Sequence, residues 1–81
     1  MNAIASLLAV IDAYQAADGA ADKTVSGRVF KDTKKLAALR AGQAITTARL
    51  EGALEWLSEN WPAGAAWPDG IARPWKYGEV A

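Results

Sequence analysis

The sequence predicts an all-α fold, a small helix-turn-helix bundle of four helices followed by an irregular C-terminal segment rich in Trp and Pro. Much of its 52% hydrophobic content is alanine, which favours helix over strand. Apolar residues recur at the i, i+3, i+4, i+7 spacing of one helix face in several segments, and no segment alternates with period two for long enough to indicate a strand. The 81 residues suffice for one compact domain of modest stability.

The first helix is predicted between Asn2, as N-cap, and Gly19, a residue suited to ending a helix. Its apolar face consists of Ile4, Leu7, Leu8, Ile11 and Tyr14.

The second helix is predicted near residues 23–31, where Val25 and Val29 are four positions apart. Asp22 or Thr24 is expected to cap its start. The stretch Lys31-Asp32-Thr33 then interrupts the pattern, because Asp and Thr favour caps and turns over helix interiors.

The third helix is predicted near residues 33–41, with Leu36 and Leu39 on its buried side and Gly42 as the left-handed residue after its end. A fourth helix is predicted from Thr46 or Thr47, as N-cap, to about Asn60. Its apolar face consists of Leu50, Ala53, Leu54, Leu57 and Trp61.

Residues 61–81 form a different kind of segment, with all three prolines and three of the four tryptophans. Pro and Gly at this density exclude a long helix. We therefore divide the chain into a domain of residues 1–60 and a C-terminal segment of residues 61–81. Because Trp61, Trp67 and Trp75 are costly to leave in water, we expect this segment to pack on the helices, or alternatively to contact a partner or a second copy.

Several classes of protein are excluded by composition. Without Cys or His, the chain has neither a disulfide framework nor the usual zinc ligands, and it lacks the base of Ser–His or Cys–His catalysis. The run Glu51, Glu55 and Glu59 is interpreted as an acidic outer stripe of the fourth helix, not a catalytic pair. We expect no enzyme activity, metal, cofactor or small-molecule substrate. The longest apolar stretch, residues 3–11, is too short to span a membrane, so we expect a soluble, cytoplasmic protein.

The charges are unevenly distributed although they sum to zero. Residues 1–22 carry three acidic residues and no basic one, and residues 50–81 carry five acidic and two basic residues. Residues 23–49 carry seven of the nine basic residues against Asp32 alone, a net charge of +6. A basic segment of this kind is typical of a surface that faces phosphate.

The stretch from Val25 to Leu57 resembles the helix-turn-helix domain of Cro and phage (lambda-type) repressors, and the whole chain is similar to small prophage-type bacterial transcriptional regulators. The resemblance rests on two sequence motifs, Leu36-Ala-Ala-Leu39-Arg40-Ala41-Gly42 and Ile45-Thr46-Thr47-Ala-Arg-Leu50-Glu-Gly-Ala-Leu54. The usual glycine of the turn is absent, and Phe30-Lys31-Asp32 stands in its place, which leaves the register of the residues after it open.

The resemblance implies a homodimer that binds double-stranded DNA and represses transcription by occupying an operator. It places four residues of the recognition helix in the major groove: Thr33, Lys34, Lys35 and Ala38. Residues assigned to the phosphate backbone are Ser26, Arg28, Lys31, Arg40, Gln43 and Thr46. Backbone N–H groups at the start of the recognition helix would also face phosphate.

Three other interpretations remain open. Arg28 and Arg40 could pair with Glu51 or Glu55 instead of phosphate, and the basic face could then be an ordinary solvated surface. The chain could be a protein-binding adaptor, such as a phage inhibitor or an antitoxin, that uses the basic face or the Trp segment. It could also bind DNA without sequence preference.

Overall fold

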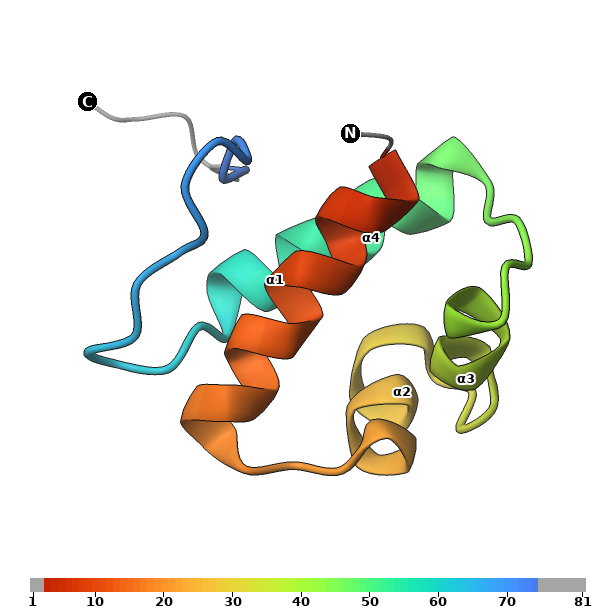
Figure 1. Ribbon diagram of the computed structural model, residues 1–81, viewed down its shortest axis with the longest axis horizontal. Helices are drawn as coiled ribbons and strands as arrows, with labels where there is room; N and C mark the ends of the chain where they lie inside the picture. Colours follow the sequence, from red (N-terminus) through yellow and green to blue (C-terminus); the bar gives the residue numbers. More distant parts are fainter. Residues whose placement is uncertain (1–2, 75–81) are drawn as a thin grey trace.

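The computed structural model describes residues 3–74, and these residues form four helices and no strand. The helices are α1 (Ala3–Asp18), α2 (Asp22–Phe30), α3 (Lys35–Arg40) and α4 (Thr47–Glu59), shown in Figure 1. For these residues the prediction of an all-α fold with four helices is confirmed. None of these helices is both long and apolar enough to cross a membrane.

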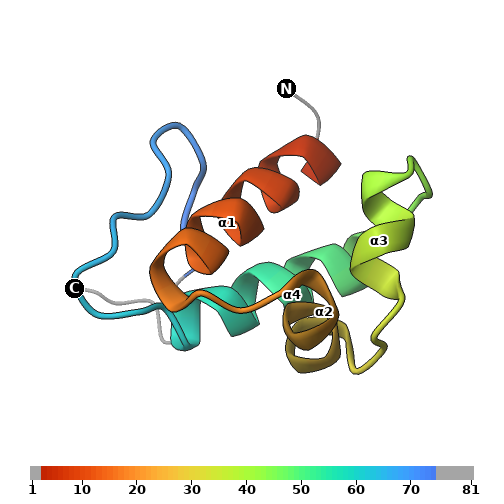
Figure 2. The same ribbon diagram turned by 60° about the horizontal axis from the view of Figure 1, so that its bottom comes forward.

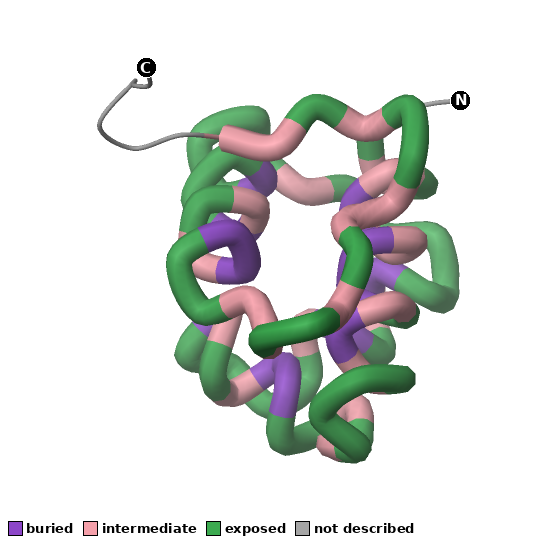
Figure 3. Tube along the Cα trace, turned by 90° about the vertical axis from the view of Figure 1, so that its left-hand side faces the viewer, coloured by how far each residue is buried: buried purple, intermediate pink, exposed green. Residues whose placement is uncertain are grey.

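Helices α1 and α4 lie side by side and run in the same direction (Figures 1 and 2). Helix α2 packs against α4 and, most extensively, against α3. The short helix α3 therefore stands at the end of the molecule opposite the C-terminal segment (Figure 1). The turn before α3 is exposed, and so are Ala37 and Arg40 of α3 itself. Figure 3, viewed from the opposite side of the molecule, shows where buried, intermediate and exposed positions lie along the chain.

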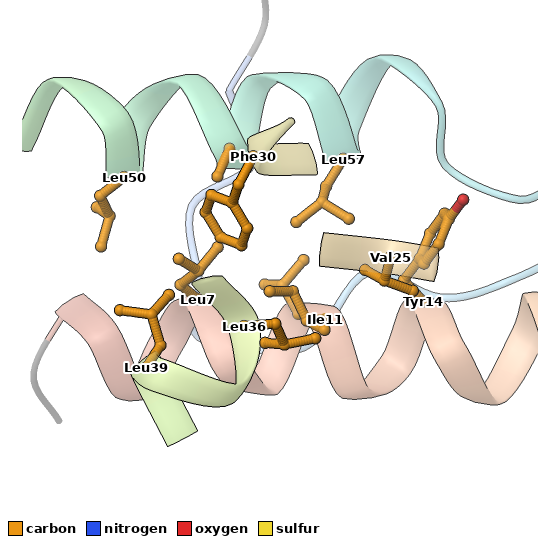
Figure 4. Close-up of a cluster of buried hydrophobic side chains, with 11 residues drawn as sticks. Leu7, Ile11, Tyr14, Val25, Phe30, Leu36, Leu39, Leu50 and Leu57 are labelled. Atoms are coloured by element: carbon orange, nitrogen blue, oxygen red, sulfur yellow. The ribbon is translucent and has the colours of Figure 1, made fainter. Parts of the chain in front are cut away.

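One hydrophobic core joins all four helices, as the side chains in Figure 4 show. Its largest fully enclosed members include Leu7, Ile11, Leu36, Leu39 and Leu57. On α1 the buried face is rotated toward Val10, which is fully buried, and away from Leu8, which is only partly buried. Most of the predicted face residues of α1 and α4 are buried, whereas Ile4, Leu8 and Leu54 are only partly buried.

Three predicted helix boundaries are confirmed, the ends of α1 and α3 and the start of α4. Gly19, with φ of 83°, follows the last residue of α1, and Gly42, with φ of 102°, follows the end of α3. After α3, the N–H of Gly42 donates to Leu39 and the N–H of Gln43 donates to Ala38, the paired bonds of a Schellman motif. At the start of α4, the Thr46 side chain accepts a hydrogen bond from the N–H of Arg49 at 3.2 Å.

Two predicted helix starts are wrong. Helix α2 begins at Asp22, and the residue at its N-cap is Ala21, which has no side chain that can cap. The Asp22 carboxylate, which was a predicted cap, instead accepts hydrogen bonds from Gln15 and Arg40. Helix α3 begins at Lys35 and not at residue 33. The Asp32 side chain accepts a hydrogen bond from the N–H of Lys34 at 2.9 Å, and this local bond holds the preceding residues in a turn.

Beyond α4, residues 61–74 contain neither helix nor strand and lie against the helices. The Trp61 ring contacts Tyr14 of α1 and Trp67, with centroid distances of 6.2 Å and 4.8 Å. Both indole N–H groups are satisfied within the segment, Trp61 donating to Ala65 and Trp67 to Ile71. These two tryptophans extend the small core, whereas Trp75 and the proposed cap Asn2 lie outside the described residues.

Candidate nucleic-acid interface

The pair α2 and α3 is held together by buried apolar residues on both helices. Val25 of α2 and Leu36 of α3 are fully buried, and Leu39 is 2% exposed. Val29, which was expected to share this contact, is only partly buried, and Phe30 beside it lies in the core. The two helices are thus packed together, with an exposed turn between them.

A buried serine fixes the turn between α2 and α3. The Ser26 hydroxyl donates a hydrogen bond to the carbonyl of Asp32 and accepts one from the N–H of Leu36 at 2.9 Å. Ser26 is 0% exposed, so it does not reach a phosphate, and the sequence-based assignment to the phosphate backbone is corrected. A buried hydroxyl needs partners inside the fold, and the turn supplies both.

The first backbone N–H groups of α3 are likewise used inside the protein. Asp32 accepts from Lys34 through its side chain and from Lys35 through its carbonyl, and Ser26 accepts from Leu36. The expectation that backbone N–H groups here bind phosphate is therefore corrected for these three residues.

Lys31 occupies the place where the resemblance implies a glycine. Its backbone is left-handed, with φ of 59° and ψ of 26°, and its N–H donates to the carbonyl of Gly27 at the end of α2. An L-residue is strained in this conformation. Its side chain is exposed at the turn.

Arg28 and Arg40 are engaged with other side chains of the protein. Arg28 donates to the Tyr14 hydroxyl at 2.9 Å and to Asp18 at 3.1 Å. Arg40 forms salt bridges with Asp12 and Asp22 at 2.9 Å and 3.0 Å. Both arginines therefore pair with carboxylates, but with aspartates of α1 and α2 and not with the glutamates of α4. These aspartates occupy part of each guanidinium group, and the assignment of both arginines to phosphate stays a prediction.

Four other cations, in the α2–α3 turn, at the start of α3 and on α4, lack any such pairing with a carboxylate of the described residues. We call Lys31, Lys34, Lys35 and Arg49 the basic quartet; none forms a salt bridge with a carboxylate of residues 3–74. Arg49 of α4 donates to the carbonyl of Phe30, which places it beside Lys31, and Lys35 donates to the carbonyl of Ala44. The course of the α2–α3 turn can be followed in Figure 2.

Arg49 was not among the predicted site residues, although it belongs to the basic segment. Its position three residues after the N-cap of α4 was readable from the sequence, but its contact with the end of α2 was not, since 19 residues separate the partners. At the C-terminal end of α2 its guanidinium also satisfies a carbonyl that the helix leaves free.

The remaining predicted site residues are placed as follows. Thr33 is exposed in the turn before α3, and Gln43 is exposed just after α3. Ala38 is half-buried, whereas its neighbour Ala37 is exposed, so the outward face of α3 differs by one residue from the expected one. The hydroxyl of Thr46 caps α4 and is therefore partly committed to the fold.

Comparison with known proteins does not assign the α2–α3 unit to a family. No protein-family model, no curated protein and no solved structure matches this chain. Within residues 3–74 no group of acidic side chains is arranged to hold a metal ion. The function is therefore inferred from the geometry and charge of the α2–α3 unit.

Proposed function

We propose that this chain is a sequence-specific DNA-binding protein of the helix-turn-helix type that binds double-stranded DNA through the basic quartet and α3. The observation that carries the proposal is the division of the basic residues into two groups. Arg28 and Arg40 are paired with aspartates, while no residue of the quartet forms a salt bridge with a described carboxylate. Lys31 and Lys34 of the quartet lie in the turn that leads into α3, and Arg49 contacts the end of α2. Positive charge is thus concentrated where a groove-binding helix pair would need it.

The quartet is suited to contacting phosphates on either side of a groove. Lysine and arginine side chains fix the register of a protein on DNA without reading its sequence. Thr33, exposed in the turn before α3, and the small residues of α3 are then brought to the base edges. Alanine and threonine can contact thymine methyl groups.

A dimer on two half-sites is part of the proposal. One domain of this size makes few contacts, and affinity in the range of specific repressors requires more. Two copies on half-sites about 34 Å apart, one helical turn of DNA, would block polymerase by occupancy. The protein would then act as a transcriptional repressor of the phage or prophage type.

The test is fluorescence anisotropy with a labelled duplex from the region upstream of its own coding sequence, beside a scrambled duplex, at several salt concentrations. Lys34→Ala and Lys35→Ala are expected to weaken binding. The salt slope, which is the steepness with which the logarithm of the binding constant falls with the logarithm of the salt concentration, should decrease by about 0.9 for each phosphate that is no longer neutralised. The matched control is Lys23→Ala, which removes the same charge from an exposed site at the other end of α2. It should leave the slope nearly unchanged.

Three outcomes would contradict the proposal in different ways. Equal binding to both duplexes would show DNA binding without sequence preference. Absence of binding at low salt would exclude DNA as the partner and favour a protein adaptor. If Lys23→Ala weakened binding as much as Lys34→Ala, the quartet would not be the interface.

A further inference from the structure

A single guanidinium at the end of α3 joins three helices. Arg40 is the last residue of α3, and its Nη2 donates to Asp12 of α1 at 2.9 Å and to Gln15 of α1 at 3.0 Å. Its Nε and Nη2 donate to the two carboxylate oxygens of Asp22, at the start of α2, at 3.0 Å and 3.3 Å. Gln15 closes the ring by donating to Asp22 at 2.7 Å. We call these four side chains the Arg40 clasp.

At this end of α3 the Arg40 clasp acts beside the buried side chain of Leu39. Helix α3 has only six residues, and a helix so short depends on tertiary contacts for its stability. Its start is tied to α2 through Ser26 and Leu36, and its main packing partner is α2. The hydrogen bonds of Arg40 to Asp12 and Gln15 connect its far end to α1.

The same surroundings are unfavourable for a phosphate. Two carboxylates, Asp12 and Asp22, flank the guanidinium, and a phosphate approaching it would meet their negative charge. Hydrogen bonds from Gln15 and then Arg40 lower the pKa of Asp22, so this carboxylate is ionised at neutral pH. The cation of Arg40 is therefore balanced inside the fold.

We infer that Arg40 is a positioning residue for DNA binding: it fastens the end of α3 to α1 and α2, sets the orientation of α3, and does not contact DNA. This inference rests on the proposed function. If Arg40 contacted the phosphate backbone, its neighbours Asp12 and Asp22 would weaken DNA binding through their negative charge. If Arg40 positions α3, the same two aspartates support DNA binding, because they hold Arg40 in place.

The decisive variant is Asp22→Asn. Removing a negative charge from a protein that binds DNA should strengthen binding if only overall charge mattered. If Arg40 positions α3, the variant instead weakens binding, because one side of the Arg40 clasp is removed. The matched control is Asp69→Asn, which changes an exposed carboxylate far along the chain from the Arg40 clasp. This variant should bind DNA as tightly as the unaltered protein or slightly more tightly.

Arg40→Ala supplies the second readout. We expect about a two- to thirtyfold loss of affinity, the range for residues that act on a binding site through other residues. Its salt slope should equal that of the unaltered protein, whereas Lys34→Ala lowers the slope by about 0.9. Arg40→Lys should recover part of the affinity, because one ammonium can still reach one carboxylate.

Hydrogen exchange of the free protein completes the experiment and needs no DNA. In Arg40→Ala the amides of α3 should exchange faster while those of α1 and α4 keep their protection. Tighter binding by Asp22→Asn, or a lower salt slope for Arg40→Ala, would overturn the inference. Failure of the unaltered protein to bind any duplex would instead refute the proposed function, and the exchange data would still show whether Arg40 holds α3.

Discussion

The hydroxyl of Ser26 accepts a hydrogen bond from the backbone N–H of Leu36, ten residues later, at 2.9 Å. Through this bond a side chain of α2 caps the first turn of α3, where helix N–H groups lack intrahelical partners. The hydroxyl donates its own proton to the carbonyl of Asp32 in the intervening turn. One buried atom thereby defines both the shape of the turn and the start of the proposed recognition helix.

Replacing Ser26 by alanine should therefore be costly. Ser26→Ala leaves the Leu36 N–H and the Asp32 carbonyl without their partner in a buried site, and we expect unfolding free energy to fall by about 1–3 kcal/mol. Urea unfolding followed by circular dichroism measures this. Thr24→Ala, at an exposed position of the same helix, is the control and should change stability by less than about 0.5 kcal/mol. Equal effects of the two variants would show that the turn does not depend on the serine.

Lys31→Gly should separate stability from binding. Glycine adopts the left-handed conformation of Lys31 without strain, so we expect a gain of up to about 1 kcal/mol in unfolding free energy. The same change removes one cation of the basic quartet and should weaken DNA binding and its salt dependence. Lys31→Ala loses the charge without relieving the strain, so it should weaken binding without stabilising the protein. A glycine variant less stable than the unaltered protein would contradict this explanation.

Two glycines offer a paired test of backbone conformation. At Gly52, inside α4, a Cβ would meet nothing within 4 Å, so Gly52→Ala should stabilise the protein by about 1 kcal/mol. At Gly42 the space is also open but φ is 102°, so Gly42→Ala should destabilise it by about 1 kcal/mol or more. Thermal unfolding of both variants decides the point. Stabilisation by Gly42→Ala would mean that the end of α3 is not held in the left-handed conformation.

Acid should weaken the Arg40 clasp at Asp22. Hydrogen bonds from Gln15 and Arg40 lower the pKa of Asp22, so the ionised carboxylate stabilises the folded state. This contribution is complete above the ordinary aspartate pKa of about 4 and is lost as the pH falls below that value. The difference in unfolding free energy between the unaltered protein and Asp22→Asn should therefore shrink from pH 7 to pH 3 in urea titrations. A difference that stayed constant would contradict a role for the ionised form.

Arg73 should hold the C-terminal segment on α4. Its Nε donates to the Ser58 hydroxyl at 2.9 Å, its Nη2 donates to the Ser58 carbonyl at 2.7 Å, and its guanidinium lies 5.3 Å from the centre of the Trp67 ring. Arg73→Ala is expected to shift the indole N–H signal of Trp67 in NMR spectra and to lower stability by about 1 kcal/mol. Glu51→Ala, on the outer side of α4, is the control. An unchanged Trp67 signal would show that the segment stays in place without the arginine.

The sequence by itself determined the helices and most of their ends. Gly19 and Gly42 end α1 and α3, and Thr46 caps α4, because a cap or a left-handed residue acts on backbone groups within one turn of its own position. The apolar faces were readable for the same reason, since their spacing is a property of one helix. The rotated face of α1 was not, because the position of α4 and of the other neighbours decides whether Val10 or Leu8 is enclosed.

The tertiary structure alone decided which polar residues are available to a partner. Arg40 pairs with Asp12 across 28 positions, Arg28 with Asp18 across 10, and Ser26 is buried by a helix that follows it. Composition identified the basic segment but could not separate neutralised arginines from the basic quartet. The physical reason is that an ion pair forms between side chains that the fold brings within about 4 Å, whatever their separation along the chain.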